Sequence, residues 1–176
     1  MVTGVLVCVS SVVGAQSPDQ RAAERVMGPH WKQVARAAGM IFTGRVLSIK
    51  RQAPTQGSPI PTVEVKFHVD RGIAGVGPGQ IVTIREWAAL WPMQRPMRGD
   101  RSMLFFFYPP SSAGLTSPVG GPLGQVSLDP AVNVTQGKLT NDRSRRMRPS
   151  LGPVEGPPTG IVQLERAIRA ARAGKD

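Results

Sequence analysis

The stretch VEVKFHVD, from Val63 to Asp70, decides the fold class of this chain. Apolar residues occupy every second position, and charged or polar residues fill the positions between them. Because successive side chains of a β-strand point to opposite faces, this period of two predicts a strand with one face in a core and one in water. Similar segments, separated by turns rich in glycine and proline, extend from Ile41 to Leu128, so we expect a small all-β barrel or sandwich.

The strand before this stretch, expected over residues 40–50, does not alternate cleanly. Its apolar side chains change face beside Gly44, which predicts a bulge or a bend in a long first strand. After the stretch we expect a strand over residues 62–70, a glycine-rich turn over residues 72–79 and a further strand over residues 80–87.

The apolar run MLFFF, residues 103–107, shows no alternation at all. Such a run indicates a central strand buried on both faces, and we expect that strand over residues 101–108. Short strands predicted over residues 125–128 and 132–134 complete the β-rich part. The pattern favours a mainly β fold, a small five-stranded OB-type barrel flanked by an N-terminal and a C-terminal helix.

Helical patterns stand on both sides of the strands. The sequence from Ser17 to Gln20 combines a serine N-cap, a proline at the first helical position and a glutamine three residues after the cap. An apolar stripe from Trp31 to Ala38 predicts a second, short helix. We expect a C-terminal helix over residues 159–174 to pack on the barrel with one apolar side, which consists of Ile161, Leu164, Ile168 and Ala171.

The formal net charge of +11 and the pI near 11.4 predict attraction to polyanions such as nucleic acid, anionic lipid headgroups or acidic envelope polymers. Much of the excess is arginine within residues 143–148 and 166–172, and the simpler interpretation of each run is an ordinary solvated face. Residues 137–158 are basic and rich in proline and glycine, which predicts a flexible segment between a domain over residues 16–136 and the last helix.

The first 15 residues contain no charged side chain, and an apolar run there is followed by small residues up to Ala15. This pattern predicts a signal peptide over residues 1–15, cleavage near Ala15, and a periplasmic or secreted protein without stable membrane insertion. A buried N-terminal strand is the alternative. Cleavage would remove Cys8, the only cysteine, and with it disulfides, thiol nucleophiles and thiolate metal sites.

Three segments carry a resemblance to a known family: AGMIFTGRV at residues 38–46, FHVDRG at residues 67–72 and LFF at residues 104–106. Together they resemble the netrin-like barrels of the tissue-inhibitor-of-metalloprotease type, which occur in many bacterial exported proteins without an assigned role. Residues 87–91 and 114–121 are similar to that uncharacterised exported group. The resemblance implies an OB-type barrel more than a function.

Inhibition is not implied by this resemblance. The animal members use an amino-terminal cysteine to chelate a protease's zinc, whereas the mature terminus expected here is Gln16. Catalytic motifs are also missing from the sequence: His30 and His68 are expected on the surface, and the pair His68 and Asp70 is too small for a catalytic metal site. We therefore expect neither an enzyme nor a bound metal or cofactor.

One group of side chains stands out as a candidate binding surface because it combines tryptophan with arginine. Indole rings stack on sugars or bases, and guanidinium groups pair with phosphates or carboxylates. In the alternative interpretation the tryptophans close the barrel end and the arginines only solvate it. The group consists of Arg85, Trp87, Trp91, Arg95, Arg98 and Arg101.

The sequence therefore favours an exported, non-catalytic binding domain at the cell envelope, with an envelope protein or an anionic polymer as its partner. The alternative is a cytoplasmic OB-fold protein that binds single-stranded nucleic acid. Such binding is driven by counterion release and by exposed aromatic rings, and only 5% of this chain is aromatic.

Overall fold

The computed structural model describes residues 17–55, 59–91, 101–128 and 159–174. The predicted signal segment, the strand expected over residues 132–134 and the basic segment 137–158 lie outside these ranges. The described elements follow one another in this order: α1 (Pro18–Met27), α2 (Trp31–Ala37), β1 (Met40–Gln52), β2 (Thr62–Ala74), β3 (Ile81–Trp87), β4 (Met103–Phe107), a 3₁₀ turn (Gly121–Gly124), β5 (Gln125–Ser127) and α3 (Thr159–Arg172).

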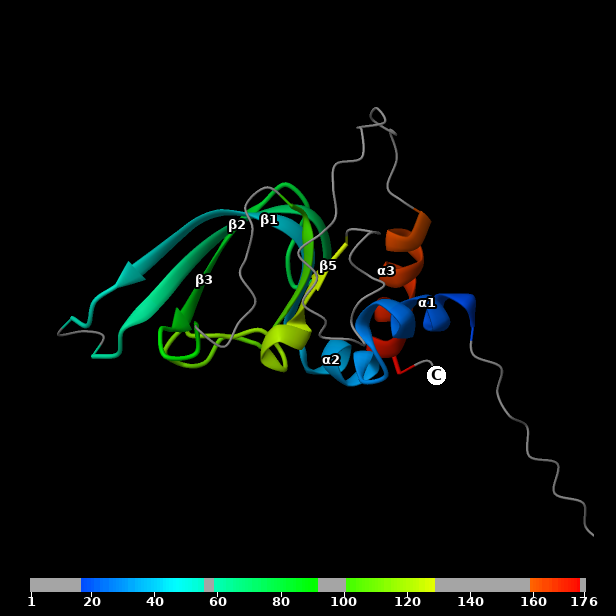
Figure 1. Cartoon of the computed structure of the whole chain (residues 1–176), viewed down its shortest axis with the longest axis horizontal. Coiled ribbons are helices and arrows are strands. Elements are labelled where there is room, and N and C mark those ends of the chain that lie inside the picture. Colours follow the sequence, from blue (N-terminus) through cyan, green and yellow to red (C-terminus); the bar gives the residue numbers. More distant parts are fainter. Residues whose placement is uncertain (1–16, 56–58, 92–100, 129–158, 175–176) are drawn as a thin grey trace, which may run out of the picture.

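The five strands form one antiparallel sheet in the order β3-β2-β1-β4-β5, so the mainly β prediction is confirmed. As described, the sheet is open, with β3 and β5 at its edges. The three helices gather at one end of the sheet, and β1, β2 and β3 continue beyond them at the other end (Figure 1).

The long first strand is irregular, as the sequence predicted. Its register with β2 shifts at three places, one of them between Thr43 and Gly44. A Cβ atom at Gly44 would lie 2.3 Å from the carbonyl oxygen of His68, so only glycine allows the two strands to approach this closely. The bulges bend β1 and β2 and re-aim their side chains.

The prediction that a turn begins at Gly72 is wrong, because β2 continues to Ala74 and Gly72 pairs with Phe42 in the sheet. A Cβ atom at Gly72 would lie 2.1 Å from the carbonyl oxygen of Val76. The glycine therefore serves a close backbone approach inside the strand, and the turn comes later.

The β4 strand is buried on both faces, as predicted. Leu104 and Phe106 pack toward the helices, whereas Phe105 and Phe107 pack into a second apolar cluster on the other face of the sheet, here called the inner cluster. The inner cluster contains four phenylalanine rings with centroids 4.8–6.1 Å apart, in edge-to-face, tilted and stacked pairs: Phe42, Phe67, Phe105 and Phe107. The alternating apolar residues of β2, fully buried, belong to the same cluster.

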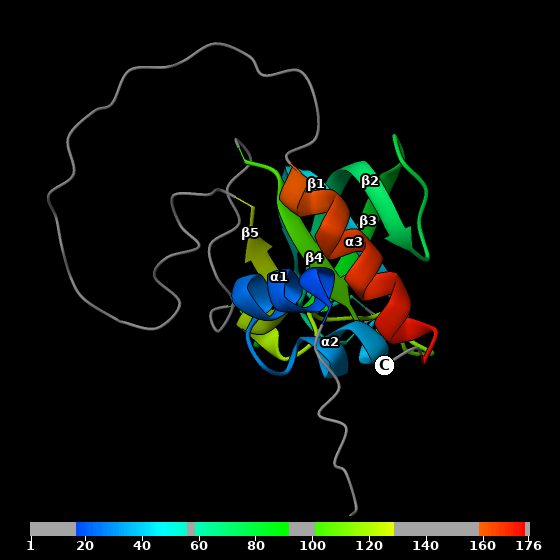
Figure 2. The ribbon, with the colours of Figure 1, turned by 90° about the vertical axis from the view of Figure 1, so that its right-hand side faces the viewer.

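The N-terminal helices begin as the sequence predicted. Ser17 is the N-cap of α1: its hydroxyl accepts from the Gln20 N–H at 3.2 Å, and the Gln20 side chain accepts from the Ser17 N–H at 3.3 Å. The helices α1, α2 and α3 lie together on one side of the sheet (Figure 2). The apolar side of α3 is buried against them and against Leu104 and Phe106. None of the described helices is long and apolar enough to span a bilayer.

Arginine side chains hold α3 in place at its C-terminal end. The Arg172 guanidinium donates to the carbonyl oxygens of Ala35, at 2.8 Å, and of Ala38, at the end of α2. In return, Arg36 of α2 donates from Nε to the carbonyl oxygen of Ala171 at 3.0 Å. Each helix thus caps the C-terminus of the other with a cation, which satisfies orphan carbonyls and offsets both helix dipoles.

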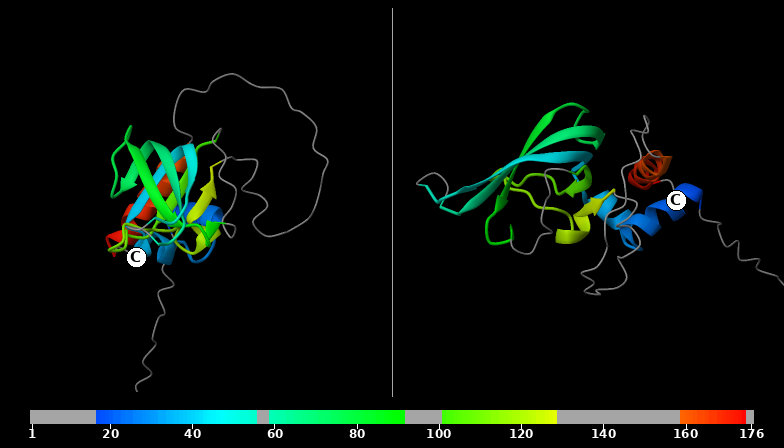
Figure 3. Two further views of the ribbon diagram at one scale, coloured as in Figure 1. Left: turned by 90° about the vertical axis from the view of Figure 1, so that its left-hand side faces the viewer. Right: turned by 45° about the horizontal axis from the view of Figure 1, so that its top comes forward.

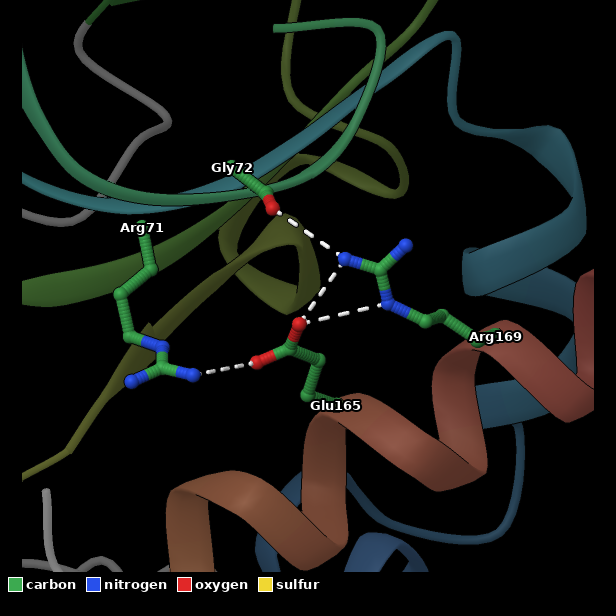
Figure 4. A network of polar contacts seen from close by, with 4 residues as sticks. All are labelled: Arg71, Gly72, Glu165 and Arg169. Carbon is green, nitrogen blue, oxygen red and sulfur yellow. Dashed lines mark hydrogen bonds and ion pairs between the residues drawn. The ribbon is translucent and has the colours of Figure 1, made fainter. Parts of the chain in front are cut away.

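A second set of contacts joins α3 to β2 (Figure 4). Glu165 lies between two guanidinium groups and accepts from Arg71 at 3.0 Å and from Arg169 at 2.8 Å, and Arg169 also donates to the Gly72 carbonyl oxygen. Burial acts to raise the pKa of Glu165, but the hydrogen bonds and charges of the two arginines outweigh it and hold that pKa below its ordinary value.

Candidate functional site

The face of β1, β2 and β3 that points away from the inner cluster is called the outer sheet face. Because directly opposite residues of paired strands share a face, the register of the three strands arranges the outer residues in four rows. Read from the far end of the sheet toward the helices, the rows are Gln52–Thr62–Trp87, Lys50–Glu64–Arg85, Ser48–Lys66–Thr83 and Arg45–His68–Ile81.

Half of the side chains in these rows are exposed, Thr62 is buried, and the others are half-buried. Lys50, Thr83, Ile81 and Trp87 are exposed, and Trp87 retains 46% of its accessible surface. In the left view of Figure 3, which looks from the far end of the sheet, the helices stand behind the strands. Rows two residues apart along a strand are separated by about 7 Å, and neighbouring strands by about 5 Å, so the rows form a grid of mostly polar groups.

The second and third rows of this grid contain three cations, Lys50, Arg85 and Lys66. Lys50 and Lys66 make no ion pair or side-chain hydrogen bond within the described part of the chain. The Nε atom of Arg85 is buried and has no hydrogen-bond acceptor among the described residues. Glu64 lies between the flanking cations of its row, yet its Oε2 accepts from the Gln52 amide at 3.1 Å instead. The charges of Lys50, Lys66 and Arg85 are therefore left for a partner.

Four polar side chains meet at the end of the grid near the helices, in a group centred on Asp70. His68 Nδ1 lies 3.0 Å from Asp70 Oδ1, the Ser102 hydroxyl donates to Asp70 Oδ2 at 2.9 Å, and Arg45 lies 3.7 Å from the same carboxylate. Asp70 occupies an extra position in β2, where the register shifts between Val69 and Arg71, and the bulge turns its side chain toward its neighbours.

The order of these contacts decides what the group can do chemically. A serine nucleophile needs a base within hydrogen-bond reach, and that base is oriented by a third group. Here the carboxylate of Asp70 stands in the middle, so Ser102 donates to the acid and not to His68. Within the described ranges, no group of three or more His, Cys, Asp or Glu side chains could hold a metal ion.

The structure separates the candidate residues that the sequence brought together. Arg85 and Trp87 do share the outer sheet face, two residues apart on β3. Trp91 is half-buried and packs against the inner cluster, on the other side of the sheet. Arg101 is exposed just before β4. The remaining two predicted residues, Arg95 and Arg98, lie outside the described residues.

Sequence reasoning missed three side chains of the grid and one buried acid. Lys50, Glu64 and Lys66 were visible as the polar positions of alternating strands, but only the register places them beside Arg85. Glu86 is fully buried opposite Val63, on the inner side of β3. The period of two through Val82 and Ile84 could have predicted its inward direction.

The likeness of this chain to other proteins gives no further guide to the site. Comparison with protein-family models, with curated proteins and with solved structures finds no match.

Proposed function

We propose that this chain is an exported, non-catalytic binding domain that acts at the cell envelope and holds its partner on the outer sheet face. One observation carries the proposal: Lys50, Lys66 and Arg85 stand in adjacent rows near Trp87, and none of the three cations forms an ion pair within the described residues. The arrangement around Asp70 supports a binding role as well, since its contacts fix side chains without activating Ser102.

The finer fold assignment, a netrin-like OB-type barrel, belongs to the same proposal. Closing the open sheet into a barrel requires its two edges, β3 and β5, to meet. The loop between β4 and β5 supports this assignment, because it contacts the β3 edge as well as β4. Its Thr116 N–H donates to the Arg85 carbonyl oxygen on β3 at 2.9 Å, and its Val119 N–H donates to the Phe106 carbonyl oxygen on β4 at 2.8 Å.

Export is the part of the proposal that a single experiment tests directly. The uncharged, apolar residues 1–15 motivate it. Mass spectrometry of the protein recovered from its host should find a chain that begins at or near Gln16, in the periplasmic or extracellular fraction. An intact Met1 on protein recovered from the cytoplasm would overturn the export part.

Binding of single-stranded nucleic acid in the cytoplasm is the second candidate. The observation that favours it is the same exposed Trp87 among cations, since bases stack on indole rings and phosphates pair with lysine and arginine. A filter-binding titration with mixed-sequence single strands tests this candidate. Binding must weaken steeply as salt is raised, and a chain that binds no single strand at low salt excludes it.

A further inference from the structure

The acids of the outer sheet face restrict what it can bind. Glu64 stands between Lys50 and Arg85, and Asp70 lies at the end of the grid near the helices. The phosphodiester backbone of a DNA strand carries a charge at every repeat and has no free hydroxyl group that could donate to these carboxylates. A polymer rich in hydroxyl groups can instead donate hydrogen bonds to them, because an ionised carboxylate only accepts.

The aromatic content of the face points the same way. Trp87 is the single Trp, Tyr or Phe side chain among the twelve grid positions, and the other three rows end in Arg85, Thr83 and Ile81. Single-strand binders stack successive bases on several rings, whereas one indole suffices as a platform for one sugar ring. The face therefore combines one stacking position, hydroxyl acceptors and a modest excess of cations.

We infer that the outer sheet face binds an acidic polysaccharide, a chain of hydroxyl-bearing sugar rings with carboxylate groups. One ring stacks on Trp87, carboxylates of the polymer pair with Lys50, Lys66 and Arg85, and ring hydroxyls donate to Glu64. Charge complementarity supports this ligand class. The three cations form no ion pair within the described residues, and the carboxylates of the polymer would pair with them. The inference rests on the proposed function, for which it names the partner class.

Calorimetric titration of the purified full chain tests the inference with three probes: a short oligogalacturonate, a neutral glucan oligosaccharide of the same length, and a mixed-sequence DNA single strand. We expect saturable binding of the oligogalacturonate at low salt, at least about tenfold tighter than that of the neutral glucan. The single strand should bind more weakly than the oligogalacturonate.

Variants connect the binding to the face. Trp87→Ala should weaken oligogalacturonate binding about tenfold through the lost stacking, and Lys66→Gln about twofold to fivefold. Arg166→Gln is the matched control, because it removes one positive charge from an exposed position on α3, away from the sheet face. Its affinity should equal that of the unchanged chain. Thermal unfolding of each variant verifies that it is folded.

Three outcomes would overturn the inference. The first is absence of saturable oligogalacturonate binding at low salt. The second is an equal loss in Lys66→Gln and Arg166→Gln, which would mean attraction by net charge alone. The third is tighter binding of the single strand that depends on Trp87, which would make the face a nucleic-acid surface. Because export is read from the N-terminus of protein recovered from cells, a failure of this titration leaves the export result standing.

Discussion

Replacing Leu164 by alanine tests whether α3 is part of the fold. Leu164 is 2% exposed and belongs to the apolar cluster that also contains Leu104 and Phe106 of β4. A buried leucine truncated to alanine costs about 2–5 kcal/mol, depending on how far the surroundings close the cavity. Leu164 lies inside this packed cluster, and we take a value within that range, about 3 kcal/mol, as the expected cost.

The assay is thermal unfolding of the full chain followed by circular dichroism. Because the apolar side of α3 shares one cluster with β4, the helix and the sheet should unfold in a single transition. A loss of about 3 kcal/mol then lowers Tm by about 6–12 °C for a chain of this size. Arg166→Ala is the matched control on the same helix: its side chain is exposed, and its effect should stay within about 0.5 kcal/mol.

The competing explanation is that this basic, amphipathic helix serves an anionic membrane. In that case Leu164→Ala would leave Tm unchanged and would abolish binding to anionic lipid vesicles. That pair of results would refute the reasoning.

Three further substitutions test single contacts. Glu165→Gln should cost about 0.5–1 kcal/mol near neutral pH. Because the carboxyl pKa is lowered in the folded chain, this stabilisation is lost as pH falls through that pKa, so denaturant unfolding should show the difference from the unchanged chain shrinking as the solution is acidified. A difference that stays constant on acidification would contradict the ion-pair account. Gly44→Ala should cost about 1–3 kcal/mol in the same assay, because the added Cβ meets the His68 carbonyl oxygen. Gly160→Ala, which adds a Cβ in open space, should be nearly neutral. Equal effects of the two substitutions would disprove the close-approach argument. Arg172→Ala should lower stability by about 1 kcal/mol through the lost cap of α2, and a Tm identical to that of the unchanged chain would show that the cap contributes nothing.

Local patterns predicted the elements because their causes are local. The period of two through β2, the unbroken apolar run of β4 and the capping box at Ser17 each depend on neighbours within a few residues. The end of β2 was misjudged for the opposite reason. Gly72 has the composition of a turn, but the approach of Val76 and the pairing with Phe42 keep it in the strand.

The candidate site was only partly predictable, because it depends on register. Trp87 and Trp91 are four residues apart in the sequence, yet one lies on the outer sheet face and the other packs on the inner cluster, since β3 ends between them. In the same way, Lys50 reaches the row of Arg85 only after a bulge in β1 has shifted its pairing with β2. Such shifts leave no sequence pattern clear enough to place a residue opposite its partner.

The contacts of α3 change what the net charge of +11 means for a partner. From the sequence, the C-terminal arginine run is compatible with an ordinary solvated face or with a polyanion-binding surface, but Arg169 and Arg172 donate to Glu165 and to backbone carbonyl oxygens of other elements. Cations engaged in this way hold the helix and have less capacity to bind anions. Lys50 and Lys66, which stand exposed or half-exposed without such contacts among the described residues, keep that capacity. The affinity for an anionic partner should therefore follow the lysines of the sheet more closely than the arginines of the helix, although both contribute equally to the net charge.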